Sequence, residues 1–134
     1  MAETMAAYAG VATPALLLNL PALERNIDAM ASWSLANGVS IRPHAKAHKC
    51  PEIARRQLAA GAIGLTTATV YEAEAMLEAD PPEILIANEV AGEDHLGRLI
   101  GLARKTSVTV AIDDLDNARR LSAAAVAGGV SVGV

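Results

Sequence analysis

Cationic and titratable side chains are concentrated in the stretch RPHAKAHKC. Eight consecutive residues contain Arg42, His44, Lys46, His48 and Lys49, in a chain that is 52% hydrophobic. Burial and neighbouring positive charge both disfavour an ammonium ion, so a lysine held in such a cluster spends more time as a neutral amine. A neutral amine attacks carbonyl carbon and forms a Schiff base. The cluster therefore predicts amine chemistry at a lysine.

The residues before the cluster indicate which lysine carries this chemistry. Residues 39–46 (VSIRPHAK) read as a strand, along which side chains alternate between two faces. Arg42, His44 and Lys46 then share one face, and Lys46 comes last, at the carboxyl end of the strand. Barrel enzymes keep their catalytic groups at that end. We therefore expect Lys46 to be the catalytic lysine, with His44 and Arg42 below it as candidate cofactor-binding residues.

The residues alone leave other interpretations open. A basic turn after a strand is most often solvated surface, and Lys49 in that turn either attracts an anion or faces water. The spacing His44-x3-His48-x-Cys50 could be interpreted as a set of metal ligands, but it matches no well-known metal site. His95 follows two acidic residues and is expected to be a solvated helix residue.

Short apolar runs and helical patterns alternate along the chain. Strands are predicted at 13–20, 39–46, 62–69, 83–89 and 107–113, with another strand starting at 130–134. Helices are predicted at 21–38, 51–62, 70–80, 93–106 and 115–129. This alternation with short turns favours a parallel sheet, and a complete (β/α)8 barrel needs roughly 250 residues. The prediction is an α/β fold: a partial (β/α)8 TIM-type barrel with parallel strands, cut after about half the barrel.

Composition and charge exclude several classes of protein. The 134 residues allow one ordinary domain, and with 2% aromatic residues the core must be built from Ala, Leu, Val and Ile. The net charge of −4 argues against a nucleic-acid partner. We see no secretory signal and no run of about 18 apolar residues, so no membrane partner is expected. Cys50 is the one cysteine, which fits a reducing compartment, and a cytoplasmic location is expected.

Several segments resemble, in order, the D-threonine aldolase and D-serine dehydratase family of pyridoxal-phosphate enzymes, which have the alanine-racemase-type barrel. They are TPALLLNLPALERNI (13–27), RPHAKAHKCPEIA (42–54), YEAEAM (71–76) and ILIANEV (84–90). The family patterns are TPALVxDLxALExNI and RPHxKTHKxPEIA. Asn19 therefore stands where Asp is common, and Ala47 replaces the usual threonine. The resemblance covers nearly the whole chain.

The resemblance implies a role for Lys46 and a place for each strand. Lys46 would form the Schiff base with pyridoxal 5'-phosphate. The strand predicted at 13–20 would belong to a second, β-rich domain, and the strand at 39–46 would be the first of the barrel. A divalent metal assists in the family, but its ligands would lie beyond Val134, so no metal-binding residue is expected here. A homodimer is expected for the full-length protein.

The implied activity is that of a lyase acting on small D-β-hydroxy amino acids. D-threonine aldolase, which yields glycine and an aldehyde, is the first expectation. A D-serine dehydratase-type ammonia-lyase is the alternative. The 134 residues are expected to be the amino-terminal part of such an enzyme, incomplete and inactive alone. Two further hypotheses are a complete chain that binds cofactor or a partner without catalysis, and an α/β module whose basic turn is surface.

Overall fold

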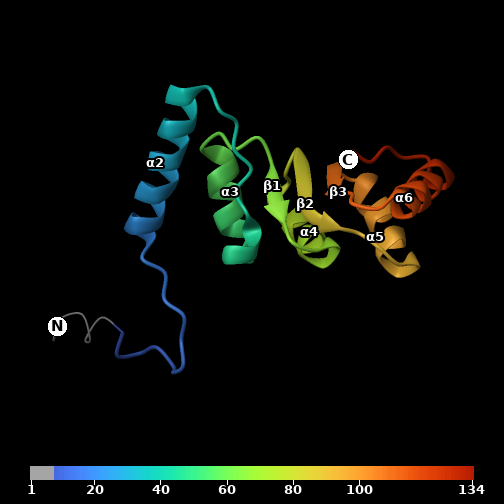
Figure 1. The fold of residues 1–134 in the computed structure, drawn as a ribbon. Helices are drawn as coiled ribbons and strands as arrows, with labels where there is room; N and C mark the ends of the chain where they lie inside the picture. Colours follow the sequence, from blue (N-terminus) through green and yellow to red (C-terminus); the bar gives the residue numbers. More distant parts are fainter. Residues whose placement is uncertain (1–7) are drawn as a thin grey trace.

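The computed structural model describes residues 8–134, in which helices and strands alternate (Figure 1). The strands are β1 (Leu65–Thr67), β2 (Glu83–Glu89) and β3 (Ser107–Ala111). The α-helices are α2 (Leu20–Asn37), α3 (Pro51–Ala59), α4 (Val70–Met76), α5 (Glu93–Ala103) and α6 (Leu115–Gly128). Two short 3-10 helices are η1 (Ala45–Ala47) and η2 (Leu77–Ala79). Within residues 8–134, every helix is too short or too polar to cross a membrane.

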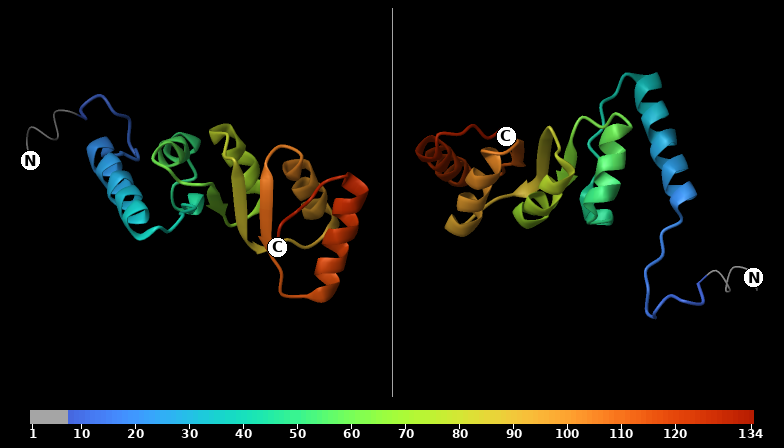
Figure 2. Two further views of the ribbon diagram at one scale, coloured as in Figure 1. Left: turned by 90° about the horizontal axis from the view of Figure 1, so that it is seen from above. Right: turned by 180° about the vertical axis from the view of Figure 1, so that it is seen from behind.

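The three strands form one parallel sheet in the order β1-β2-β3. Isolated bridges extend it on both sides, where His44 pairs with Thr66 and Gly133 pairs with Thr109. Helices α3, α4 and α5 lie on the same side of the sheet (Figure 2). Parallel strands with helices on one face are the arrangement of a (β/α) barrel wall. The predicted α/β fold with parallel strands is confirmed.

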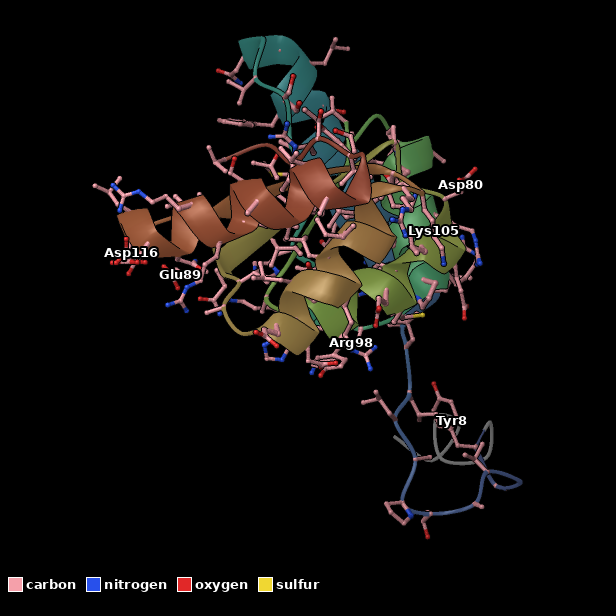
Figure 3. All side chains as sticks on the ribbon, turned by 90° about the vertical axis from the view of Figure 1, so that its right-hand side faces the viewer. Tyr8, Asp80, Glu89, Arg98, Lys105 and Asp116 are labelled. Carbon is pink, nitrogen blue, oxygen red and sulfur yellow. The ribbon has the colours of Figure 1, made fainter. Side chains whose placement is uncertain are left out.

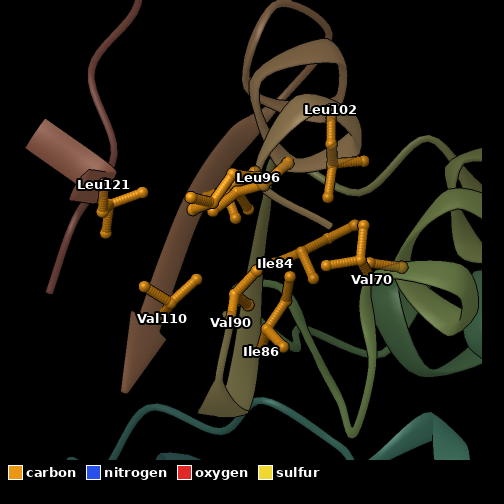
Figure 4. Close-up of a cluster of buried hydrophobic side chains, with 11 residues drawn as sticks. Val70, Ile84, Ile86, Val90, Leu96, Leu102, Val110 and Leu121 are labelled. Atoms are coloured by element: carbon orange, nitrogen blue, oxygen red, sulfur yellow. The ribbon is translucent and has the colours of Figure 1, made fainter. Parts of the chain in front are cut away.

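The main core lies between the sheet and helices α4, α5 and α6 (Figure 4). It is aliphatic, as the composition predicts, and its fully buried side chains include Ile84, Ile86, Val108 and Leu99. Gly128 allows α6 to approach α5, because a Cβ at this position would collide with Ile100 Cγ2. Burial of these aliphatic side chains, each contributing about 1.5–3 kcal/mol, orders the strands that lead to the candidate site.

The helix ends follow signals that are local in the sequence. Asn19 Oδ1 accepts a hydrogen bond from Ala22 N at 3.0 Å and begins α2, while Gly38 ends it in the left-handed region with φ of 62°. Asp114 caps α6 in the same way through Asn117 N at 2.7 Å. Most other predicted boundaries differ from the observed ones by a few residues at the element ends.

The predicted strand at 13–20 is wrong for this structure. Residues 13–19 form no strand, and Leu16, Leu17 and Leu18 are exposed. A strand needs a neighbouring backbone for its hydrogen bonds. In residues 8–134 no segment pairs with this one. Whether it joins a second β-rich domain stays a prediction.

The predicted strand at 39–46 is only partly correct. Residues 41–44 run beside β1, because Ile63 N donates to Ile41 O at 3.0 Å and Thr66 N donates to Pro43 O at 2.8 Å. Pro43 has no N–H to return to the ladder, so only an edge position suits it. After His44 the chain turns into η1. Lys46 therefore lies in a one-turn helix at the end of this edge segment, and not in a strand.

Helix α2 stands apart from the core in Figures 1 and 2. None of its residues is buried, and Met30 and Trp33 are about half exposed. A groove of about 490 Å³ separates α2 from the edge segment and α3, and it is lined by Leu23, Ile27 and Met30 on the helix side. The helix is tied to α3 by an ion pair between Glu24 and Arg56 at 3.0 Å.

Candidate active site

Lys46 lies in the middle of η1, in a turn that is closed by its own backbone hydrogen bonds. His44 Nδ1 accepts from Lys46 N at 3.3 Å and so caps the turn. The carbonyl oxygen of Ala45, a buried residue, accepts from His48 N at 3.1 Å and from Lys49 N at 2.7 Å. Lys49 has a φ of 51°, a left-handed conformation that is costly for a side-chain-bearing residue. This geometry reverses the chain into α3.

The side chain of Lys46 is exposed, and its Nζ has no ion pair or hydrogen bond within residues 8–134. The expected burial of this lysine is therefore wrong for this structure. The reason is that the sheet is open, so no strand in the described part of the chain lies opposite the turn. An accessible, unpaired primary amine remains, and that is the group needed to attack a carbonyl carbon.

The two cofactor-binding candidates lie at different levels of the sheet. His44 is half-buried, caps the Lys46 turn and pairs with Thr66 near the carboxyl end of β1. Arg42 Nε instead donates to Glu83 Oε1 at 2.5 Å, at the first residue of β2. This hydrogen bond raises the pKa of Arg42 above its ordinary value. The structure therefore brings His44 to Lys46 and holds Arg42 toward the amino end of the sheet.

Glu72 is a residue of the site that the sequence reasoning missed. Its Oε2 accepts from Ala68 N at 2.9 Å, and its Oε1 pairs with Lys49 Nζ at 3.2 Å. The pKa of Glu72 is lowered, chiefly by the Ala68 hydrogen bond, with Lys49 and His44 adding to the effect against burial. The spacing Thr69-x-x-Glu72 is a helix-capping signal that could have placed this carboxylate.

The neighbouring histidines do not form a metal centre. In residues 8–134, no three His, Cys, Asp or Glu side chains are close enough to hold a metal ion, so His44, His48 and Cys50 do not act together. His48 Nδ1 accepts from Cys50 N at 3.1 Å, while its Nε2 is buried without a partner. Burial lowers the pKa of His48, although the adjacent Gln57 side chain opposes this. The His48 ring therefore binds a proton less readily than a free imidazole does.

A small pocket of about 170 Å³ opens at the carboxyl ends of β1 and β2. Thr69, Asn88 and His95 contribute polar groups to its lining. His95 is exposed, as predicted for a solvated helix residue, and its ring meets that of Tyr71 edge-on at 5.6 Å between centroids. The pocket lies on the same edge of the sheet as the Lys46 turn, which is the edge where barrel enzymes bind ligands.

Comparison with known proteins places this geometry in a family. Residues 18–134 match the family model for the alanine racemase N-terminal domain. The chain is 44% identical over 126 residues to D-threonine aldolase from Arthrobacter sp., an alignment that covers 94% of this chain and 33% of that enzyme. It thus spans about a third of the length of this relative.

Solved structures support the same family assignment. The D-threonine aldolase from Filomicrobium marinum superposes with a TM-score of 0.88 and 47% identity, covering 91% of this chain and 33% of that one. The D-threo-3-hydroxyaspartate dehydratase from Delftia sp. HT23 superposes with a TM-score of 0.81 and 31% identity, covering 92% and 32%. The fold is therefore that of the amino-terminal portion of these enzymes. The chain belongs to the alanine racemase N-terminal domain family.

Proposed function

We propose that this chain supplies the lysine-bearing part of the active site of a pyridoxal-phosphate-dependent lyase acting on small D-β-hydroxy amino acids. The best-supported activity is that of a D-threonine aldolase, which breaks the Cα–Cβ bond of D-threonine to release glycine and acetaldehyde. One observation carries the proposal: an exposed lysine amine with no ion pair in residues 8–134, at the carboxyl end of the first edge segment, in a chain 44% identical to such an aldolase.

The residues present fit the aldehyde group of pyridoxal phosphate. Attack on an aldehyde carbon requires an amine that is accessible and not held by a carboxylate. Lys46 Nζ meets both conditions in the described part of the chain, whereas Lys49 Nζ pairs with Glu72 at 3.2 Å. Lys105 is also exposed, but it follows α5, whereas Lys46 lies at the carboxyl end of the edge segment beside β1, so Lys46 is the residue that would hold the cofactor. Bound pyridoxal phosphate supplies an electron sink for the charge that develops on the substrate α-carbon.

The surrounding residues orient the amine. His44 caps the turn through Lys46 N, and the bridge between His44 and Thr66 fixes the turn to the end of β1. His44 is thus proposed to contact the cofactor region beside Lys46. Arg42 is also proposed as a cofactor-binding residue, and its guanidinium is engaged by Glu83 toward the amino end of the sheet.

The test is to identify which lysine reacts with pyridoxal phosphate. The protein is incubated with the aldehyde, the product is reduced with borohydride, and the labelled peptide is located by mass spectrometry. Label at residue 46 is expected to exceed that at Lys105, to be lost in Lys46→Ala and to remain, at a lower rate, in Lys49→Ala. Lys49→Ala is the matched control because the two lysines lie three residues apart in one turn. Label lost in Lys49→Ala and retained in Lys46→Ala would overturn the assignment.

A dehydratase is the second candidate, supported by the structural match to the dehydratase from Delftia sp. HT23. Products separate the two reactions, because an aldolase releases glycine and an aldehyde whereas a dehydratase releases ammonia and a keto acid. The assay uses the longest protein that the gene encodes, supplied with D-threonine and pyridoxal phosphate. Glycine and acetaldehyde in equal amounts support the aldolase, and ammonia with a keto acid supports the dehydratase.

The remaining expectations stay proposals. A cytoplasmic location is supported by the single cysteine and a homodimer by the family resemblance. A divalent metal, bound outside the described residues, is supported by a related dehydratase structure described as a metal-free form. The net charge of −4 continues to argue against a nucleic-acid partner.

A further inference from the structure

The turn that carries Lys46 has few ties to the rest of the molecule. The last backbone hydrogen bond from the edge segment to β1 is made by Pro43 O, which accepts from Thr66 N. Beyond the bridge between His44 and Thr66, the backbone bonds that the described chain shows for residues 45–49 stay inside the turn. Ala45 packs into a small cluster with Leu65 and Met76. The turn also contains the strained backbone of Lys49. The bridge and the buried Ala45 fix the start of the turn, and its far end at Lys49 has a separate attachment.

Glu72 provides that attachment. One carboxylate oxygen accepts from Ala68 N at 2.9 Å, directly after β1, and the other pairs with Lys49 Nζ at 3.2 Å. Its side chain is only 17% exposed, so water screens this pair less than it screens a pair in which both partners are open. Glu72 thus joins the end of β1, the first turn of α4 and the Lys46 turn.

We infer that Glu72 is a positioning residue for Lys46: its ion pair with Lys49 sets the place of the Lys46 amine at the carboxyl end of β1. This inference rests on the proposed role of Lys46. A residue that merely capped α4 would act through Ala68 alone. The variant Glu72→Gln separates the two roles, because its side-chain amide keeps an acceptor for Ala68 N while losing the charge that holds Lys49.

The experiment measures the rate at which Lys46 is labelled by pyridoxal phosphate and borohydride, relative to Lys105 in the same molecule. Lys105 is exposed and lies after α5 (Figure 3), so it reports general reactivity. Glu72→Gln and Lys49→Gln are each expected to lower the ratio about two- to five-fold, the size of coupling across a partly exposed ion pair. The double variant should equal either single variant, and Lys49→Arg should restore the wild-type ratio.

Glu74→Gln is the matched control. Glu74 lies on the same helix and also has an ion pair, with Arg98 at 3.0 Å, but Arg98 is on the outer side of α5 (Figure 3). The Lys46 ratio should not change in this variant. An equal loss in Glu74→Gln, or multiplied losses in the Glu72→Gln/Lys49→Gln double variant, would refute the inference. Lys49→Gln leaves the α4 cap untouched, so it tests the inference even where Glu72→Gln unfolds the helix.

A second readout does not involve the cofactor. Reductive methylation with formaldehyde and cyanoborohydride, resolved by residue, reports the accessibility of Lys46 against Lys105. A changed ratio in Glu72→Gln and Lys49→Gln, restored by Lys49→Arg, supports the positioning role. An unchanged ratio by both readouts contradicts it. Failure of pyridoxal phosphate to label Lys46 in the wild-type chain would instead overturn the proposed function, while the methylation ratios would still decide the role of Glu72.

Discussion

Gly64 offers a strong test of the packing that places the Lys46 turn. It directly precedes β1, where that strand, the edge segment 41–44 and β2 run side by side. A Cβ added to Gly64 would lie 2.5 Å from the carbonyl oxygen of Glu83 and would also collide with Glu83 Cγ. Real Cβ atoms essentially never come within 3.0 Å of such atoms, so β2 must move by about half an ångström.

The size of the effect follows from two opposing terms. Overpacking against backbone costs about 1–3 kcal/mol, and the upper part of that range applies because a carbonyl group cannot rotate away. Replacing glycine by alanine also lowers the conformational entropy of the unfolded chain, and this offsets about 0.4–1 kcal/mol of the overpacking cost. Gly64→Ala is therefore expected to lower the free energy of unfolding by about 1–2 kcal/mol. The corresponding fall in melting temperature is about 4–8 °C for a domain of this size.

Urea unfolding followed by far-ultraviolet circular dichroism measures this change. Gly97→Ala is the matched control, because Gly97 lies within α5 and an added Cβ meets nothing within 4 Å. It should raise the free energy of unfolding by up to about 1 kcal/mol, the helix-propensity gain of alanine over glycine. Equal midpoints for Gly64→Ala and the wild-type protein would refute the proposed approach of β1 to Glu83.

Three further predictions concern the core, a helix cap and pH. Leu99→Ala removes a fully buried side chain of the main core and should lower the free energy of unfolding by about 2.7–5.0 kcal/mol in the same urea assay. Asn19→Ala removes the cap of α2 and should cost about 1 kcal/mol of helix stability, seen as lost helical dichroism with Asn19→Ser as the conservative control. Burial lowers the pKa of His48 from 6.5, so the unfolded chain binds more protons than the folded chain just below that pH. The free energy of unfolding should therefore fall as the pH drops through this window. His48→Gln should flatten the dependence of stability on pH near pH 6, and an unchanged dependence would contradict the burial argument.

The helices and the sheet class were predictable because their signals are local. The spacing of apolar residues predicted the order of strands and helices. Helix ends were marked by Asn19, Gly38 and Asp114, which act through hydrogen bonds within a few residues. The strand predicted at 13–20 failed for the opposite reason. Its three leucines look like a buried strand, but the run becomes a strand only beside another backbone, and residues 8–134 provide none for it.

The candidate site was predicted in part. Side-chain alternation placed Arg42, His44 and Lys46 on one face, and the structure keeps His44 with Lys46. Side-chain alternation could not predict that Glu83 holds Arg42, because that contact joins residues 41 positions apart. Alternation also could not predict that Lys46 is exposed, since its burial depends on which part of the chain lies opposite the turn.

The sequence by itself determined the α/β order, the helix caps and a lysine at the carboxyl end of the segment 39–46, since each follows from residues within a turn or two of one another. Only the tertiary structure decided that Glu83 holds Arg42 and that Glu72 reaches the Lys46 turn through Lys49. Both contacts join groups that are far apart in the sequence. The packing of β1 and α4 brings the charges of Lys49 and Glu72 together, although these residues are far apart in the sequence.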